Sequence, residues 1–149
     1  MKKLVFNLCV FFLAGVPVMA QNASVNRVPA VVINAFQQQF PKARQVEWDR
    51  KQDGTYEAEF NVGLIGRDQT AVISPEGKVL VHEEEIASSS LPEAVKNQIK
   101  VQFGGYRTEE AKKISTGHAV AYEVELENRK GDLKVRFNAD GKILKERMD

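Results

Sequence analysis

The chain has 149 residues, which is enough to bury one adequate hydrophobic core, and its formal net charge is +1. Loss of the two lysines at positions 2 and 3 with a predicted export signal changes this charge to −1. Nucleic acid and anionic membranes call for a basic surface, so the charge balance argues against both as partners. The single cysteine, Cys9, lies inside the same signal, and we therefore expect no disulfide in the mature chain.

Residues 1–20 have the pattern of a bacterial export signal. A positively charged start precedes the apolar stretch Leu4–Leu13, and Val18-Met19-Ala20 supplies the small residues that a signal peptidase recognises. The apolar stretch is shorter than the ~20 residues that span a bilayer. We predict cleavage after Ala20, a periplasmic or secreted protein without stable membrane insertion, and a short polar lead-in over residues 21–27.

The first predicted unit covers residues 28–86 and opens with a helix. After Pro29, the apolar residues Val32, Phe36 and Phe40 recur at i, i+4 and i+8, which is typical of one buried helix face. After this helix, apolar residues recur at every second position. This alternation and the turn residues predict four antiparallel strands near 46–49, 56–62, 69–74 and 78–83.

The second predicted unit covers residues 91–149 and follows a polar linker at 87–90. Leu91, Val95, Ile99 and Phe103 again recur every four residues, and Ser90 has capping-box spacing for the start of this helix. Strands are predicted near 120–127, 133–138 and 142–146, with a weaker signal over 107–114.

A repeated stretch indicates that the two units are copies of one another. Pro75-Glu76-Gly77-Lys78-Val79-Leu80, which closes the first unit, returns as Ala139-Asp140-Gly141-Lys142-Ile143-Leu144 at the end of the second. We therefore predict an α+β fold in which two tandem α-β-β-β-β units form one antiparallel sheet of about eight strands. Both helices should lie on one face of the sheet and share one core.

Three features carry a resemblance to a known family. They are the proline-started helices, the strands Tyr56-Glu57-Ala58-Glu59 and Tyr122-Glu123-Val124-Glu125, and the closing Gly-Lys-Val/Ile-Leu hairpins, all doubled behind an export signal. The chain resembles the secreted PepSY-like proteins over residues 28–149, a group placed with a β-lactamase-inhibitor-like fold. The resemblance implies a tandem architecture with a curved sheet and suggests inhibition of an enzyme.

No motif in the sequence points to catalysis or to a cofactor. His82 and His118 stand apart from other metal ligands, and no nucleophile elbow or phosphate-binding loop is present. We predict a non-enzymatic binding or regulatory module without metal or cofactor, holding an envelope or secreted protein on the solvent-facing side of the sheet. The alternative is an ion- or small-ligand-binding protein that uses exposed carboxylates, including a weak calcium site near Glu83–Glu85. The sequence leaves the oligomeric state open. By alternation, the residues predicted on the binding face are Glu47, Asp49, Glu57, Glu59, Glu123, Glu125, Lys134 and Arg136.

Overall fold

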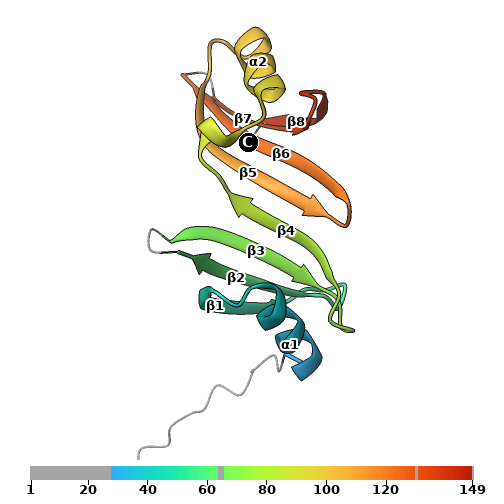
Figure 1. Cartoon of the computed structure of the whole chain (residues 1–149). Helices are drawn as coiled ribbons and strands as arrows, with labels where there is room; N and C mark the ends of the chain where they lie inside the picture. The colour runs from blue at the N-terminus through green and yellow to red at the C-terminus, as the bar shows by residue number, and fades with distance from the viewer. Residues whose placement is uncertain (1–27, 64–65, 130, 149) are drawn as a thin grey trace, which may run out of the picture.

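The computed structural model describes residues 28–63, 66–129 and 131–148 as an α+β fold (Figure 1). The predicted signal at 1–20 and lead-in at 21–27 lie outside these residues. The helices are α1 (Ala30–Gln39) and α2 (Glu93–Gln102), with a short 3-10 helix η1 (Ser88–Ser90) before α2. The strands are β1 (Ala43–Arg50), β2 (Tyr56–Val62), β3 (Arg67–Ile73), β4 (Val79–Glu85), β5 (Arg107–Thr116), β6 (Ala119–Asn128), β7 (Gly131–Asn138) and β8 (Ile143–Met148).

The eight strands form one antiparallel sheet in the order of the sequence, from β1 at one edge to β8 at the other. Within each half, short connections favour this order because consecutive antiparallel strands need only a hairpin, whereas η1 and α2 lie between β4 and β5. The two halves join where β4 pairs with β5, from His82 opposite Ser115 to Glu85 opposite Lys112. Figure 1 shows α1 beside the first half and α2 beside the second. The predicted fold class is confirmed.

Helix α1 packs on the sheet through the predicted apolar stripe. Val32 and Phe36 are buried, and the Phe36 ring lies 5.1 Å from the Trp48 ring and 5.0 Å from the Phe60 ring. The helix ends at Phe40, whose N–H still donates to the Phe36 carbonyl, because the residue before a proline avoids the helical region.

Helix α2 repeats this packing on the second half of the sheet. Val95 and Phe103 are buried, and the Phe103 ring meets the Phe137 ring at 6.5 Å. The predicted capping box at Ser90 is wrong. Ser90 closes η1, and Pro92 stands at the N-cap position, where no side chain caps the helix. The physical reason is that Leu91 and Pro92 are both extended, which moves the helix start beyond the reach of the serine hydroxyl.

The prediction of one shared core is also wrong. Each helix covers its own half of the sheet, so the buried apolar residues form two separate clusters, and the backbone pairing of β4 with β5 joins the two halves of the sheet. The first cluster contains Val32, Phe36, Tyr56, Ala58, Phe60, Ala71 and Ile73, and the second contains Leu91, Val95, Phe103, Ala111, Val124, Leu126, Leu133, Val135 and Phe137.

The repeated Gly-Lys stretch forms the last hairpin turn of each half. In the second copy, the Asn138 carbonyl accepts from the Gly141 N–H at 3.1 Å, and the Asn138 side chain accepts from the Lys142 N–H at 2.8 Å. A Cβ atom at Gly141 would stand 2.6 Å from the Ala94 carbonyl oxygen on α2. In the first copy, a Cβ atom at Gly77 would stand 3.0 Å from the Val31 carbonyl oxygen on α1. Each turn is therefore pressed against the helix of its own half.

Candidate binding face

The predicted site residues lie together on the face of the sheet opposite the helices, which we call the open face. Directly opposed residues of neighbouring strands point to the same side, so the register places each residue on one face. A series of opposed residues that crosses several strands forms a row on one face, and all eight predicted residues belong to rows of the open face. The longest row runs Glu47, Glu59, Thr70, Glu83, Ile114, Ala121, Asn138.

On the first half of the open face, two acidic residues of β1 each lie opposite an acidic residue of β2. Asp49 lies opposite Glu57, and Lys51 lies between them, with its Nζ atom 3.3 Å from Asp49 and 2.5 Å from Glu57. The hydrogen bond that Lys51 donates to Glu57, together with its hydrogen bond to Asp49, raises the pKa of Lys51. Glu47 lies opposite Glu59, and no cation pairs with either among the described residues.

The unpaired Glu47 and Glu59 carboxylates line a groove of about 360 Å³ on this half. Asp68 joins them from β3, whereas Arg44 in the adjacent row forms no ion pair with them. Both glutamates are exposed to solvent. The groove is therefore a concentrated anionic surface, which attracts a cation. Its other lining residues are Gln45, Phe60, Asn61, Gln69 and Thr70.

On the second half, the predicted residues neutralise one another. Arg136 donates to Glu123 at 2.7 Å, and the Lys134 Nζ atom lies 3.3 Å from Glu125. A small hollow of about 80 Å³ beside these pairs is also lined by Lys145 and Arg147 of β8. Exposed ion pairs of this kind contribute little stability, but each pair neutralises the two charges that form it. The two halves thus differ electrostatically although their folds repeat.

An apolar seam on the open face was not predicted. Ile114 keeps only 4% of its surface exposed, although it lies on the side opposite both helices and belongs to neither buried cluster. Ala121 lies opposite it, and Val72 lies opposite Val81 in the next row. Because β5 has a mixed pattern in sequence, only its pairing with β4 and β6 shows which face Ile114 occupies.

The acidic run Glu83–Glu85 does not converge on one point. Glu83 and Glu85 belong to the open face, opposite Ile114 and Lys112, whereas Glu84 points to the helix side, opposite Lys113. In residues 28–63, 66–129 and 131–148, no group of three or more His, Cys, Asp or Glu side chains is arranged to hold a metal ion. The geometry therefore adds nothing in favour of the predicted calcium site.

His82 sits on the helix side, where Phe40 covers it at a ring distance of 4.8 Å and Gln69 makes a 2.9 Å hydrogen bond to its Nε2 atom. Burial lowers the pKa of His82, and Lys113 lowers it further against an opposing effect of Glu84. The folded protein consequently binds fewer protons at this site than the unfolded chain does when the pH falls through about 6.5.

We expect His82 to make folding less stable in weak acid. Its contribution is fully present above the ordinary histidine pKa and is lost progressively as the pH falls toward the lowered pKa of the folded state. Urea unfolding of the wild type and of His82→Gln between pH 5 and 8 measures this effect. The free energy of unfolding should fall more steeply for the wild type, and parallel curves would contradict the expectation.

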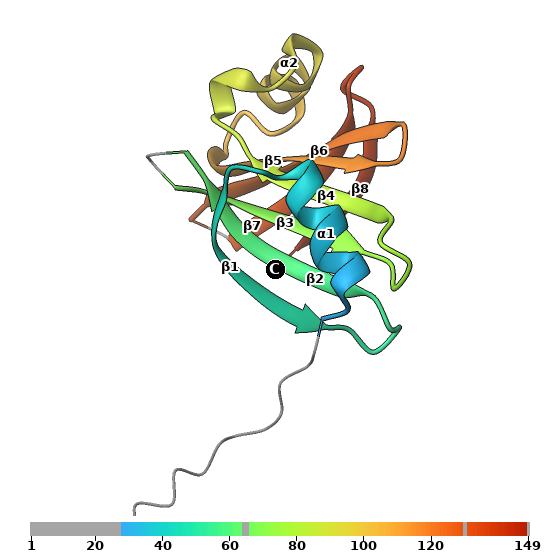
Figure 2. The same cartoon turned by 60° about the horizontal axis from the view of Figure 1, so that its bottom comes forward.

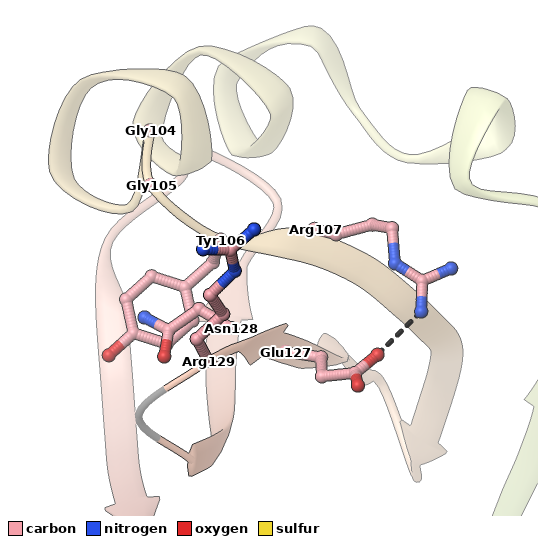
Figure 3. Close-up of a pocket in the computed structure, with 7 residues that line it drawn as sticks. All are labelled: Gly104, Gly105, Tyr106, Arg107, Glu127, Asn128 and Arg129. Atoms are coloured by element: carbon pink, nitrogen blue, oxygen red, sulfur yellow. Dashed lines mark hydrogen bonds and ion pairs between the residues drawn. The ribbon is translucent and has the colours of Figure 1, made fainter.

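Another hollow, of about 860 Å³, lies at the end of the sheet, between the turn after α2 and the ends of β5 and β6. Figure 3 shows Arg107 and Glu127 pointing toward one another on one side, and Tyr106, Asn128 and Arg129 gathered on the other. Arg107 bonds Glu127 at 2.5 Å and Glu109 at 2.7 Å, and these contacts raise the pKa of Arg107. The hollow is wide and open, and it has no histidine or cysteine nucleophile in its lining.

The repeated units and the charged open face define an antiparallel α+β scaffold of tandem helix-plus-four-strand repeats. The chain belongs to the PepSY-like family. The family model described as "Putative beta-lactamase-inhibitor-like, PepSY-like" matches residues 18–81 and 77–145, so the predicted resemblance is confirmed. The description concerns inhibitor-like proteins and assigns no catalytic activity. No curated protein sequence matches the chain.

Two solved structures from Bacteroides share the fold. One from Bacteroides eggerthii, described among "putative periplasmic proteins", has a TM-score of 0.73 at 16% identity and covers 81% of this chain and 88% of its own. A BLIP-like protein from Bacteroides fragilis has a TM-score of 0.69 at 18% identity, and the match covers 80% of this chain and 85% of that protein's chain. Within the described ranges, no helix has the length and apolar character needed to cross a membrane.

Proposed function

We propose that this chain is an exported, non-enzymatic binding module that holds a cationic region of an envelope or secreted protein on the first half of its open face. The observation that carries this proposal is the Glu47–Glu59 pair, two like charges that lie directly opposite each other and that have no cation partner in the described part of the chain. Like charges in this position destabilise a sheet by roughly 0.2–1 kcal/mol. A partner's lysine or arginine relieves that repulsion when it binds.

The contrast between the halves supports this assignment. At the equivalent level of the second half, Glu123 and Glu125 already have Arg136 and Lys134 as partners, so a ligand would have to displace an existing ion pair. Glu57 likewise has Lys51. Glu47 and Glu59 are the carboxylates of the predicted set that remain available to a partner. The family description as inhibitor-like supports binding of a protein, and the periplasmic description of the Bacteroides eggerthii neighbour supports the compartment.

The test combines stability with binding. In Glu47→Gln/Glu59→Gln, removing the repulsion should leave the free energy of unfolding unchanged or raise it by up to about 1 kcal/mol. The same change should weaken binding of the partner. That partner is first isolated from envelope extract on the mature chain, then purified and titrated by calorimetry. Its wild-type affinity should fall as salt is raised, since exposed charges are screened within about 10 Å at 0.1 M ionic strength.

Glu123→Gln/Glu125→Gln serves as the matched control because it removes the same number of carboxylates from the same face. This control should bind the purified partner at least as tightly as the wild type does. The proposal fails if the partner binds Glu47→Gln/Glu59→Gln with unchanged affinity and unchanged salt dependence.

A further inference from the structure

Strand β1 is an open edge of the sheet. Its paired neighbour among the described residues is β2, so the outer side of β1 presents backbone N–H and C=O groups without a strand partner. Such an edge is a template for another extended chain. A bulge between Arg44 and Glu47, with Gln45 at a φ of 51°, interrupts the start of β1. Regular pairing with β2 follows from Glu47 to Arg50, which leaves the outer side of that part without a strand partner among the described residues.

An apolar groove of about 440 Å³ runs between this edge and α1. Figure 2 shows α1 lying over the first strands of the sheet. The Phe36 ring forms the floor, 5.3 Å from the Phe40 ring and 5.1 Å from the Trp48 ring. A strand added outside β1 would direct every second side chain beneath α1, into this groove. The remaining lining residues are Ile33, Gln37, Pro41, Ala43 and Val46.

The other side chains of an added strand would emerge on the open face. Over its regular part, from Glu47 to Arg50, β1 places Glu47 and Asp49 on that face, whereas Arg44 lies on the same face before the bulge. Asp49 is paired with Lys51, and Glu47 has no cation partner among the described residues. A segment that fits both sides of the edge thus alternates lysine or arginine with apolar residues. The cations face the carboxylates, and the apolar side chains fill the aromatic groove.

We propose that β1 and α1 together receive such a segment of the partner protein as a ninth strand of the sheet. The proposal rests on the proposed function because it uses Glu47 of the same face, and it adds backbone pairing and the apolar groove. In strand addition, main-chain hydrogen bonds supply affinity, and pockets for alternate side chains supply specificity. The chain's own edge strand β8 fits less well. Lys145 and Arg147 would face the carboxylates, but Glu146 projects on the helix side and would enter the groove.

The probe is a blocked heptapeptide, Lys-Val-Arg-Leu-Lys-Val-Arg, titrated into the chain that begins at Gln21. Trp48 is the chain's one tryptophan and lines the groove, so its fluorescence reports occupation directly. We expect saturable binding with a shift of the tryptophan emission. A peptide with serine at the three apolar positions keeps the charge and should lose the emission shift.

Two further peptides separate strand addition from charge attraction. Each is N-methylated at alternate amides, one on the odd positions and one on the even, so that only one of them loses the donors that face β1. One methylated peptide should bind like the parent, and the other should bind at least about tenfold more weakly. Glu47→Lys should weaken the parent peptide about fivefold or more, whereas Glu146→Lys, on the opposite edge strand, should have little effect.

The outcomes distinguish this inference from the proposed function. Equal binding of the serine peptide, or of both methylated peptides, overturns strand addition while charge-driven binding to the open face survives. Binding that appears only when the chain begins at Val28 also overturns it, since residues 21–27 would then occupy the groove. If the peptides behave as expected but Glu47→Gln/Glu59→Gln binds the purified partner normally, strand addition stands and the proposed function fails.

Discussion

Gly141→Ala is expected to destabilise the protein by about 3–5 kcal/mol, which is a large effect for one added methyl group. Gly141 has a φ of +83°, where an L-residue is strained by about 1–2 kcal/mol. The new Cβ atom would also stand 2.6 Å from the Ala94 carbonyl oxygen, so the β7–β8 hairpin must move away from α2. Urea unfolding followed by circular dichroism measures the change.

Gly54→Ala is the matched control. Gly54 has nearly the same φ, +85°, but nothing lies within 4 Å of the position of a Cβ atom. Its substitution should therefore cost only the backbone strain, about 1–2 kcal/mol. Gly77→Ala should fall between the two, because its contact with the Val31 carbonyl oxygen is 3.0 Å. Equal losses for Gly54→Ala and Gly141→Ala would contradict the packing of the turn against α2.

Phe36→Ala is expected to cost about 3–5 kcal/mol, because it empties the centre of the first cluster. The Phe36 ring is 97% buried and contacts the rings of Phe40, Trp48 and Phe60. Since the second cluster shares no buried residue with the first, the loss should be uneven along the chain. Amide hydrogen exchange should lose protection in β2 and β3, with much smaller changes in β6 and β7.

Val101→Ala tests whether this result is specific to the core. Val101 lies on α2 with 80% of its surface exposed, and its substitution should change the free energy of unfolding by less than about 0.5 kcal/mol. A uniform loss of protection across all eight strands in Phe36→Ala would show that the two halves unfold as one unit despite their separate clusters.

The two halves of the open face have the same backbone arrangement but differ in how their charged side chains are paired. Duplicated strands place glutamates at matching positions in both halves, but Lys134 and Arg136 pair with them only in the second. The first half keeps Glu47 and Glu59 opposed and offers an aromatic groove at its edge. A fold of this kind supports many functions, so the specific site must come from such differences and not from the architecture.

Local patterns in the sequence were sufficient to predict the helices and strands, and to predict for most strand residues which face of the sheet they occupy. The spacing of Val32, Phe36 and Phe40 predicts α1, and the alternation around Tyr56 and Tyr122 predicts which residues of β2 and β6 point away from the helices. These predictions succeed because helix and strand periods are properties of neighbouring residues, and the repeat doubles the evidence for each element.

The tertiary structure alone decided which side chains meet. Glu47 faces Glu59 because the bulge after Arg44 sets the register of β1 against β2, and Ile114 is buried on the open face because β5 lies between β4 and β6. The separation of the two clusters likewise depends on where each helix lies over the sheet. Strand register and helix placement arise from contacts between residues far apart in the chain, and a one-residue change in register moves a side chain to the other face, so no local pattern contains them.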